Sequence, residues 1–163
     1  MPTPTYEPIT TVTATGGSSI LVMSSIPQTY TDLVLAVNGD SDVDDEFRLR
    51  FNGDAGSNYR VLFLYASSGG VSSAQYAATD YAQLGGLFTA GTATGSNMIN
   101  IFSYSNTTIN KTVVNTTNSG NYTQFRTNTW KSTAAITRID AYVAGGTFTN
   151  PTTFSLYGIK AAV

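Results

Sequence analysis

Apolar and cationic side chains alternate in Phe47-Arg48-Leu49-Arg50-Phe51, and a turn signal follows in Asn52-Gly53-Asp54. Successive side chains of a β-strand point to opposite faces, so this spacing predicts a strand with its three apolar residues toward a core and its two arginines toward solvent. Asn, Gly and Asp suit tight turns, because Asn and Gly tolerate positive φ and Asn and Asp bond to nearby backbone. The segment therefore predicts a half-buried strand that ends in a turn.

Short runs of the same kind recur along the whole chain, separated by clusters of Gly, Asn, Ser and Pro, which is typical of an all-β fold. Further turn signals lie at Gly16-Gly17, Asn38-Gly39, Gly69-Gly70, Ser119-Gly120-Asn121 and Gly145-Gly146. We predict strands over 9–15, 19–24, 30–38, 46–52, 59–66, 97–104, 111–117, 122–129, 136–143 and 153–160.

About eight to ten short strands in residues 9–163 predict a single antiparallel β-sandwich domain, with a jelly roll of two roughly four-stranded sheets as its expected form. Pro2, Pro4 and Pro8 predict an extended N-terminal arm over residues 1–8. Residues 72–84 leave room for a helical turn or two, and 85–95 reads as a long loop rich in Gly, Ala and Thr. The strand order does not follow from the sequence.

The composition is poor in charge: 11% of the residues are charged, against roughly 25% in an average globular protein. Thr, Ser and Asn supply about a third of the chain instead. With a net charge of −2 and eight scattered Lys and Arg residues, we expect neither nucleic acid nor an anionic membrane surface as a partner. The beginning of the sequence lacks a basic stretch followed by an apolar run, so no signal peptide is predicted.

The sequence offers little for catalysis or cofactor binding. It contains no Cys and no His, which excludes the Ser-His-Asp and Cys-His arrangements and disfavours zinc. A carboxylate pair for glycoside hydrolysis has no local signal, and surface or turn roles are the better reading. We therefore expect no enzyme activity and no cofactor.

One acidic cluster, residues 40–46, resembles the first half of a calcium loop. Such a loop needs Gly at its sixth position and Glu at its twelfth, where this chain has Asp45 and Phe51. The cluster is better interpreted as an acidic surface loop, and it supplies only weak metal candidates: Asp40, Asp42, Asp44 and Asp45.

Tyr and Trp suit both protein interfaces and sugar-binding faces, because each has a large apolar area and a polar tip. The candidate contacts with another copy or with a partner are Pro2, Pro4, Tyr6, Tyr76, Tyr81 and Trp130; Trp130 also fits a core or rim anchor. The candidates for a sugar platform, the less favoured role, are Tyr59, Tyr65, Tyr76, Tyr81, Tyr104 and Tyr122.

Five segments together resemble a group of small virion proteins of tailed bacteriophages, notably phages of cyanobacteria and other aquatic bacteria. They are SIPQTYTDL (25–33), LRFNGD (49–54), GSNY (56–59), WKSTAAIT (130–137) and SLYGIK (155–160). The resemblance runs from about residue 6 to the C-terminus, and residues 69–105 carry no matching feature. It implies a jelly-roll-like virion component, made in the host cytoplasm, without catalytic residues.

Members of this group serve as capsid decoration (cement) proteins or as domains of tail and fibre proteins. The resemblance therefore implies a protein that stabilises the outer surface of a phage head through contacts with itself, as a homo-oligomer expected to be a trimer, and with the major capsid protein or other virion proteins. The alternative is a tail or fibre domain that binds host-surface carbohydrate. A polysaccharide-degrading enzyme is the least favoured reading.

Overall fold

Thirteen strands and no helix form within the described residues of the computed structural model, which are 5–43, 45–86, 88–89, 95–119 and 122–160. None of these residues belongs to a helix long and apolar enough to cross a membrane. The strands are β1 (Tyr6–Thr13), β2 (Ile20–Met23), β3 (Asp32–Ser41), β4 (Glu46–Phe51), β5 (Tyr59–Ser67), β6 (Gly70–Thr79), β7 (Ala82–Gly86), β8 (Phe88–Thr89), β9 (Gly95–Phe102), β10 (Lys111–Ser119), β11 (Tyr122–Trp130), β12 (Ile139–Val143) and β13 (Thr153–Ile159).

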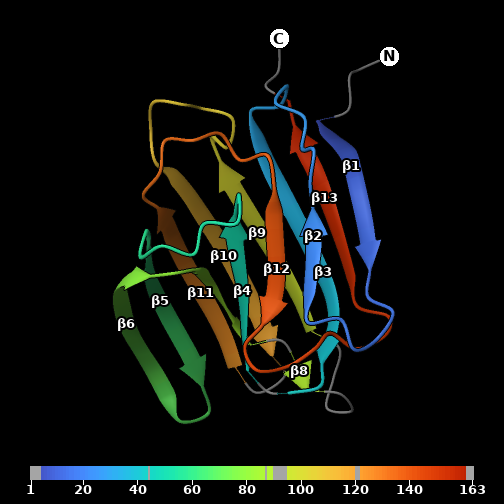
Figure 1. The fold of residues 1–163 in the computed structure, drawn as a ribbon. Helices are drawn as coiled ribbons and strands as arrows, with labels where there is room; N and C mark the ends of the chain where they lie inside the picture. Colours follow the sequence, from blue (N-terminus) through green and yellow to red (C-terminus); the bar gives the residue numbers. More distant parts are fainter. Residues whose placement is uncertain (1–4, 44, 87, 90–94, 120–121, 161–163) are drawn as a thin grey trace.

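The strands form two stacked sheets (Figure 1). The larger sheet has the order β1-β13-β3-β9-β10-β11-β5-β6, and the two-residue β8 joins β3 in parallel. The smaller sheet has the order β2-β12-β4-β7. The other strand pairs are antiparallel, which confirms the antiparallel β-sandwich predicted from the sequence.

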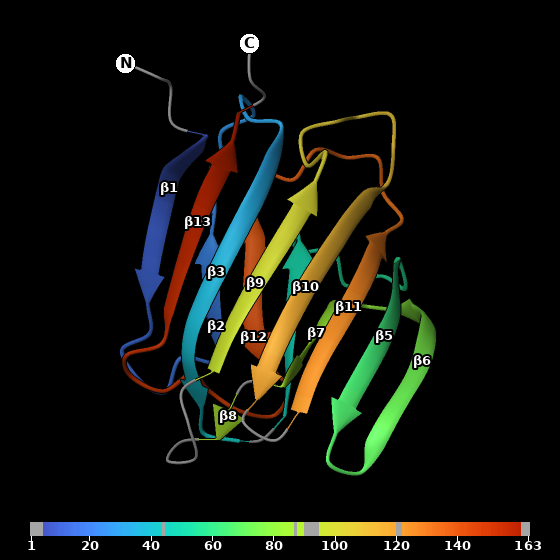
Figure 2. The same cartoon turned by 180° about the vertical axis from the view of Figure 1, so that it is seen from behind.

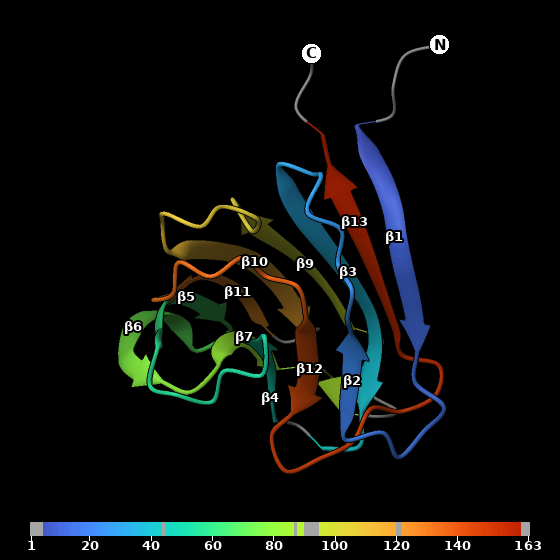
Figure 3. The same ribbon diagram turned by 45° about the horizontal axis from the view of Figure 1, so that its top comes forward.

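Eight of the strands make a jelly roll. The four-stranded groups β1-β13-β3-β9 and β2-β12-β4-β7 face one another, and the chain passes between them in the order expected for that fold. Two hairpins interrupt this path: β5–β6 follows β4, and β10–β11 follows β9. Both add to the same sheet, so the two sheets are unequal rather than about four strands each, and the β5–β6 hairpin forms the end of the larger sheet farthest from β1 (Figure 3).

All ten predicted strands are present, but thirteen strands exceed the predicted eight to ten. The helical turns considered for residues 72–84 are absent from this described segment, which holds most of β6 and the start of β7. The expected loop at 85–95 includes the end of β7 and the short β8. Residues 6–8 of the expected arm belong to β1, which begins at Tyr6 and pairs there with Ile159 of β13, and residues 1–4 lie outside the described residues.

Asn38-Gly39 does not form the predicted turn, because both residues lie inside β3. Gly39 has a φ of +145°, and a side chain there would collide with Thr152. The Thr152 hydroxyl donates to the Asp40 carbonyl at 2.8 Å, which ties the segment before β13 to β3. Gly39 therefore permits a close approach between chain segments instead of a reversal.

The core lies between the sheets. Phe47, Leu49 and Phe51 of β4 are fully buried, as the alternation predicts. Phe51 packs against Tyr59 and Trp130, with ring centroids 6.1 and 5.5 Å away. A second aromatic group joins Phe47 to the rings of Phe148 and Phe154.

Candidate binding surfaces

The outer face of the larger sheet is the side turned away from the smaller sheet, and Figure 2 looks onto it. Strand register aligns its side chains in rows that cross all eight strands from β1 to β6. One row is Thr11, Ser155, Ala36, Met98, Thr116, Phe125, Leu64 and Ser73. The rows on either side of it are Thr13, Thr153, Asn38, Ser96, Asn118, Thr123, Ala66 and Val71, and Pro8, Tyr157, Val34, Asn100, Val114, Thr127, Leu62 and Gln75.

None of the side chains in these three rows is charged. Eight strands at the usual spacing make the face about 38 Å wide, and three rows make it about 20 Å tall, or roughly 760 Å². That area is close to the roughly 800 Å² that each partner contributes to a standard protein interface. Interface cores are depleted of charge, so the size of the outer face and its lack of charge make it a candidate protein-binding surface.

Two shallow hollows lie on the outer face. The first, about 410 Å³, includes Leu62, Leu64 and Phe125. These three apolar side chains are each more than 40% exposed. The second hollow, about 480 Å³, includes Met98 and Thr116 and has a more polar lining. The outer face therefore offers apolar recesses within a surface of hydroxyl and amide groups.

The opposite, inner face of β5, β6 and β11 gathers exposed and half-buried aromatic rings. Tyr65 and Tyr122 have centroids 5.3 Å apart, and Phe63 lies 5.8 Å from Tyr76. The Arg126 guanidinium lies 4.7 Å from the centre of the Phe63 ring. This aromatic cluster is a second candidate surface, because neighbouring rings beside polar groups suit a sugar ring as well as a protein.

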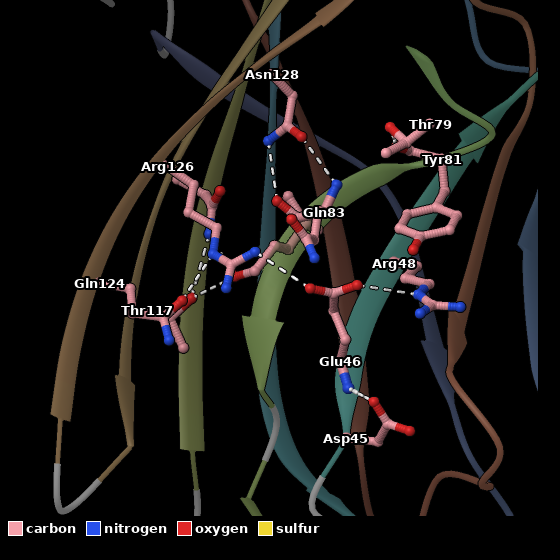
Figure 4. Close-up of polar contacts among 12 residues, drawn as sticks. Asp45, Glu46, Arg48, Thr79, Tyr81, Gln83, Thr117, Gln124, Arg126 and Asn128 are labelled. Atoms are coloured by element: carbon pink, nitrogen blue, oxygen red, sulfur yellow. Dashed lines mark hydrogen bonds and ion pairs between the residues drawn. The ribbon is translucent and has the colours of Figure 1, made fainter. Parts of the chain in front are cut away.

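Glu46 connects the two sheets through a buried ion-pair cluster (Figure 4). It accepts from Arg48 at 3.1 Å and from Arg126 of the larger sheet at 3.3 Å, while Arg126 also donates to Gln124 at 2.6 Å. Burial raises the pKa of Glu46, although both arginines oppose the shift, and burial lowers the pKa of Arg126. The charges satisfy one another, which indicates a structural clamp.

Side chains of the larger sheet also bond to the free edge of β7. Asn128 accepts from the Gln83 amide at 2.8 Å and donates to the Gln83 carbonyl at 3.1 Å (Figure 4). The Leu84 carbonyl accepts from Asn115 at 2.8 Å and from Thr117 at 2.7 Å. The β7 edge of the smaller sheet is thus paired by buried side chains at Gln83 and Leu84, and these groups are not available to another strand.

The metal candidates that the structure describes do not converge. Asp40 lies in β3, Asp42 accepts from the amide and hydroxyl of Thr147, and Asp45 accepts from the amide of Glu46. The Thr147 amide holds the pKa of Asp42 below its usual range. Asp44 lies outside the described residues. Within the described part of the chain, no three Asp or Glu residues are grouped to hold a metal ion.

The predicted contact residues have different positions. Tyr6 in β1 and Tyr76 in β6 are exposed, and Pro2 and Pro4 lie outside the described residues. Tyr81 is half-buried and stacks on Arg48, whose guanidinium is 3.9 Å from the ring centre. Trp130 lies in the core, the other position expected for it: only 2% of it is exposed, and its indole N–H donates to Asp54 at 2.7 Å.

Of the predicted sugar-platform residues, Tyr59 and Tyr104 are buried. Tyr65 and Tyr122 form one ring pair of the aromatic cluster, and Tyr76 forms the other with Phe63. Three further carboxylates form ion pairs within the protein: Glu7 pairs with Lys160, Asp80 with Arg50 and Asp140 with Arg138.

Sequence reasoning missed the outer face. Its signal is the alternation in β11, where Gln124, Arg126 and Asn128 are buried and Phe125 between them is exposed. The usual rule, that polar residues face solvent and apolar residues face the core, predicts the opposite orientation for β11.

A comparison of the chain with protein-family models, curated proteins and solved structures finds no match.

Proposed function

We propose that this protein is a structural component of a phage virion, a capsid decoration protein that binds the head surface through the outer face of its larger sheet. The single observation that carries the proposal is the absence of charge from three rows of side chains across eight strands. A surface of this kind costs little to desolvate, so broad contact with the major capsid protein or another virion protein is favourable. The segments that resemble phage virion proteins support the same role.

The proposal assigns the chain no catalytic role. Two features support this: the chain has no His and no Cys, and most of the carboxylates in its described residues are held by Arg, Lys or backbone donors.

The test is co-sedimentation of the purified protein with purified heads of the encoding phage, using Leu64→Asp as the variant. Leu64 is 55% exposed on the outer face, and a carboxylate there would have to be desolvated on binding. We expect at least a tenfold loss of binding. The matched control is Val22→Asp, because Val22 is 39% exposed on the outside of the smaller sheet.

Wild-type protein that fails to sediment with heads would overturn the decoration role. Equal binding by wild type and Leu64→Asp would show that the outer face is not the binding surface. Equal loss of binding in Leu64→Asp and Val22→Asp would show that the added negative charge, and not its position, weakens binding.

The aromatic cluster of Phe63, Tyr65, Tyr76 and Tyr122 favours a second candidate, a tail or fibre domain that binds host-surface carbohydrate. A glycan array distinguishes the two. Binding to a defined glycan that is lost in Tyr65→Ala would support this candidate, and an array without hits would leave decoration as the better proposal.

A further inference from the structure

The two ends of the larger sheet differ in how they are protected. β1 carries Glu7 and Pro8, and its register shifts between Pro8 and Thr10. Charge, proline and bulges are the devices that keep an edge strand from pairing with another chain. From Gly70 to Ala77 β6 has none of them: the ten residues of the strand, GVSSAQYAAT, include no charge and no proline, nine of them are exposed, and the register with β5 shifts only at the far end of the strand, at Ala78. At the described ends of this sheet, β6 is therefore the unprotected edge (Figure 2).

The register shows which main-chain groups of β6 are unpaired. Ser67 pairs with Gly70 across a two-residue turn, and such a closing pair is hydrogen-bonded. Hydrogen-bonded and non-bonded pairs alternate along an antiparallel ladder. The amides and carbonyls of Val71, Ser73 and Gln75 therefore point away from β5, toward the open edge.

The contacts between β5 and β11 give the same assignment of inward and outward main-chain groups. The Lys131 amide donates to the Asn58 carbonyl at 2.7 Å, so even-numbered residues of this segment turn toward β11. The Tyr59 carbonyl, by contrast, accepts from the Thr79 hydroxyl on the β6 side at 3.4 Å.

We propose that β6 pairs in antiparallel fashion with β6 of a second copy, about a twofold axis at Ser73. Ser73 is the middle of the three residues with outward main-chain groups, and it is also the centre of the stretch from Gly70 to Tyr76. In this register Val71 faces the partner's Gln75, and about six main-chain hydrogen bonds form. The contact is the same patch on both copies, so it closes at two chains.

Charge and side-chain shape favour a second copy as the occupant. In this pairing a charge on β6 near the twofold axis would lie close to the same charge of the partner and would be repelled, but β6 has no charged residue. Tyr76, which is 46% exposed, would lie opposite the partner's Gly70. An aromatic ring placed over a strand glycine stabilises a sheet, and this chain already uses that arrangement where Tyr30 covers Gly158.

The pairing would join two outer faces into one uncharged surface sixteen strands wide. The proposed pairing does not depend on the proposed function, because it rests on the main-chain groups of the β6 edge. A trimer would need a different contact.

The first test uses the absence of cysteine from the chain. Antiparallel hydrogen-bonded pairs have Cα atoms about 5.5 Å apart, within disulfide range, so Ser73→Cys should oxidise rapidly to a cross-linked dimer. Thr11→Cys is the control, because Thr11 occupies the same row at the opposite edge of the sheet and is also exposed. Cross-linking of Ser73→Cys no faster than Thr11→Cys overturns the pairing.

The second test is molar mass by light scattering at high micromolar concentration. We expect wild type at twice the 17.3 kDa of one chain, Ser73→Pro and Ser73→Lys at the mass of one chain, and Thr11→Lys unchanged from wild type. Proline at position 73 removes an outward amide without breaking the β5 ladder, and lysine places two ammonium groups at the axis. Circular dichroism and melting verify that each variant is folded.

A monomeric or trimeric wild type, or a folded Ser73→Lys that stays dimeric, overturns the pairing. Particle binding is scored separately: a dimer that does not bind heads contradicts only the proposed function, and a monomer that does bind them contradicts only the edge pairing.

Discussion

Trp130 illustrates how far residue type alone can mislead. A large aromatic side chain with a polar tip fits an interface or a core equally well, and only the fold places Trp130 against Phe51 and Tyr59. Its indole N–H donates to Asp54, which burial alone would make harder to ionise; bonds from Trp130, the Gly56 amide and Asn58 outweigh that effect and hold the pKa of Asp54 below its usual value of 3.8.

Trp130→Phe should therefore lower the free energy of unfolding at pH 7 by roughly 1–2 kcal/mol, through the lost bond to a partly solvated carboxylate. A carboxyl with a lowered folded pKa stabilises the protein above its unfolded pKa, and this stabilisation disappears as the pH falls through the folded pKa. The difference between variant and wild type should thus shrink below pH 3.8. Urea unfolding of Trp130→Phe and wild type at pH 7 and at about pH 3 measures the difference in free energy of unfolding at each pH. The same difference at both pH values would contradict the assigned bond between Trp130 and Asp54.

Arg126 was invisible to sequence analysis as an interior residue, because cations are read as surface positions. Arg126→Met removes one of the two arginine partners of Glu46, whose side chain is only 14% exposed, and leaves Arg48 as the other. We expect a loss of about 2 kcal/mol at pH 7, less than the roughly 3–5 kcal/mol for a buried charge left without any partner.

The loss should be smaller near pH 4. Without Arg126 the pKa of Glu46 rises further, and for a carboxyl with a raised folded pKa the free energy of unfolding falls as the pH rises from the unfolded value toward the folded one. The double variant Glu46→Gln/Arg126→Met is the control and should recover much of the loss. An equal loss at both pH values would contradict the coupling.

At the scale of elements, strands with a clear alternation of apolar and polar residues were predictable, whereas β6 and β7 were not. Phe47, Leu49 and Phe51 alternate because one side of β4 is core, and β4 was found from that pattern. β6 is exposed on both faces, so burial imposes no alternation on it. β7 ends in two glycines and is held by hydrogen bonds from side chains of the larger sheet. The local sequence of β7 does not indicate such bonds.

The bonds from Asn128 predict how β7 is stabilised. Asn128→Leu keeps the branched shape of the side chain but leaves the buried amide and carbonyl of Gln83 without their partner, at a cost of about 2–4 kcal/mol. Hydrogen exchange of the Gln83 amide should accelerate in the variant. Thr116→Ala, on the exposed face of the neighbouring strand, is the control and should change neither quantity. An unchanged exchange rate at Gln83 in the Leu variant would contradict this account.

At the scale of the whole molecule, the fold class followed from the sequence, but the layout of the sheets did not. The β1–β13 pair joins residues about 150 positions apart, and such pairings leave no local trace in the sequence. The outer face is likewise a property of register, because residues such as Thr11, Met98 and Ser73 share a row only after eight strands are aligned.

The pairing of Tyr6 with Ile159 has a consequence for how the chain is threaded. The Lys160 amide lies 3.3 Å from the Thr5 carbonyl, so the first and last strands begin and end side by side. The jelly roll is therefore nearly a closed loop of chain. A circular permutant that links residue 160 to residue 5 through a short glycine-serine bridge, and opens between Ser68 and Gly69, should fold with the wild-type circular dichroism spectrum. A permutant that stays unfolded would show that the original order of synthesis is itself required.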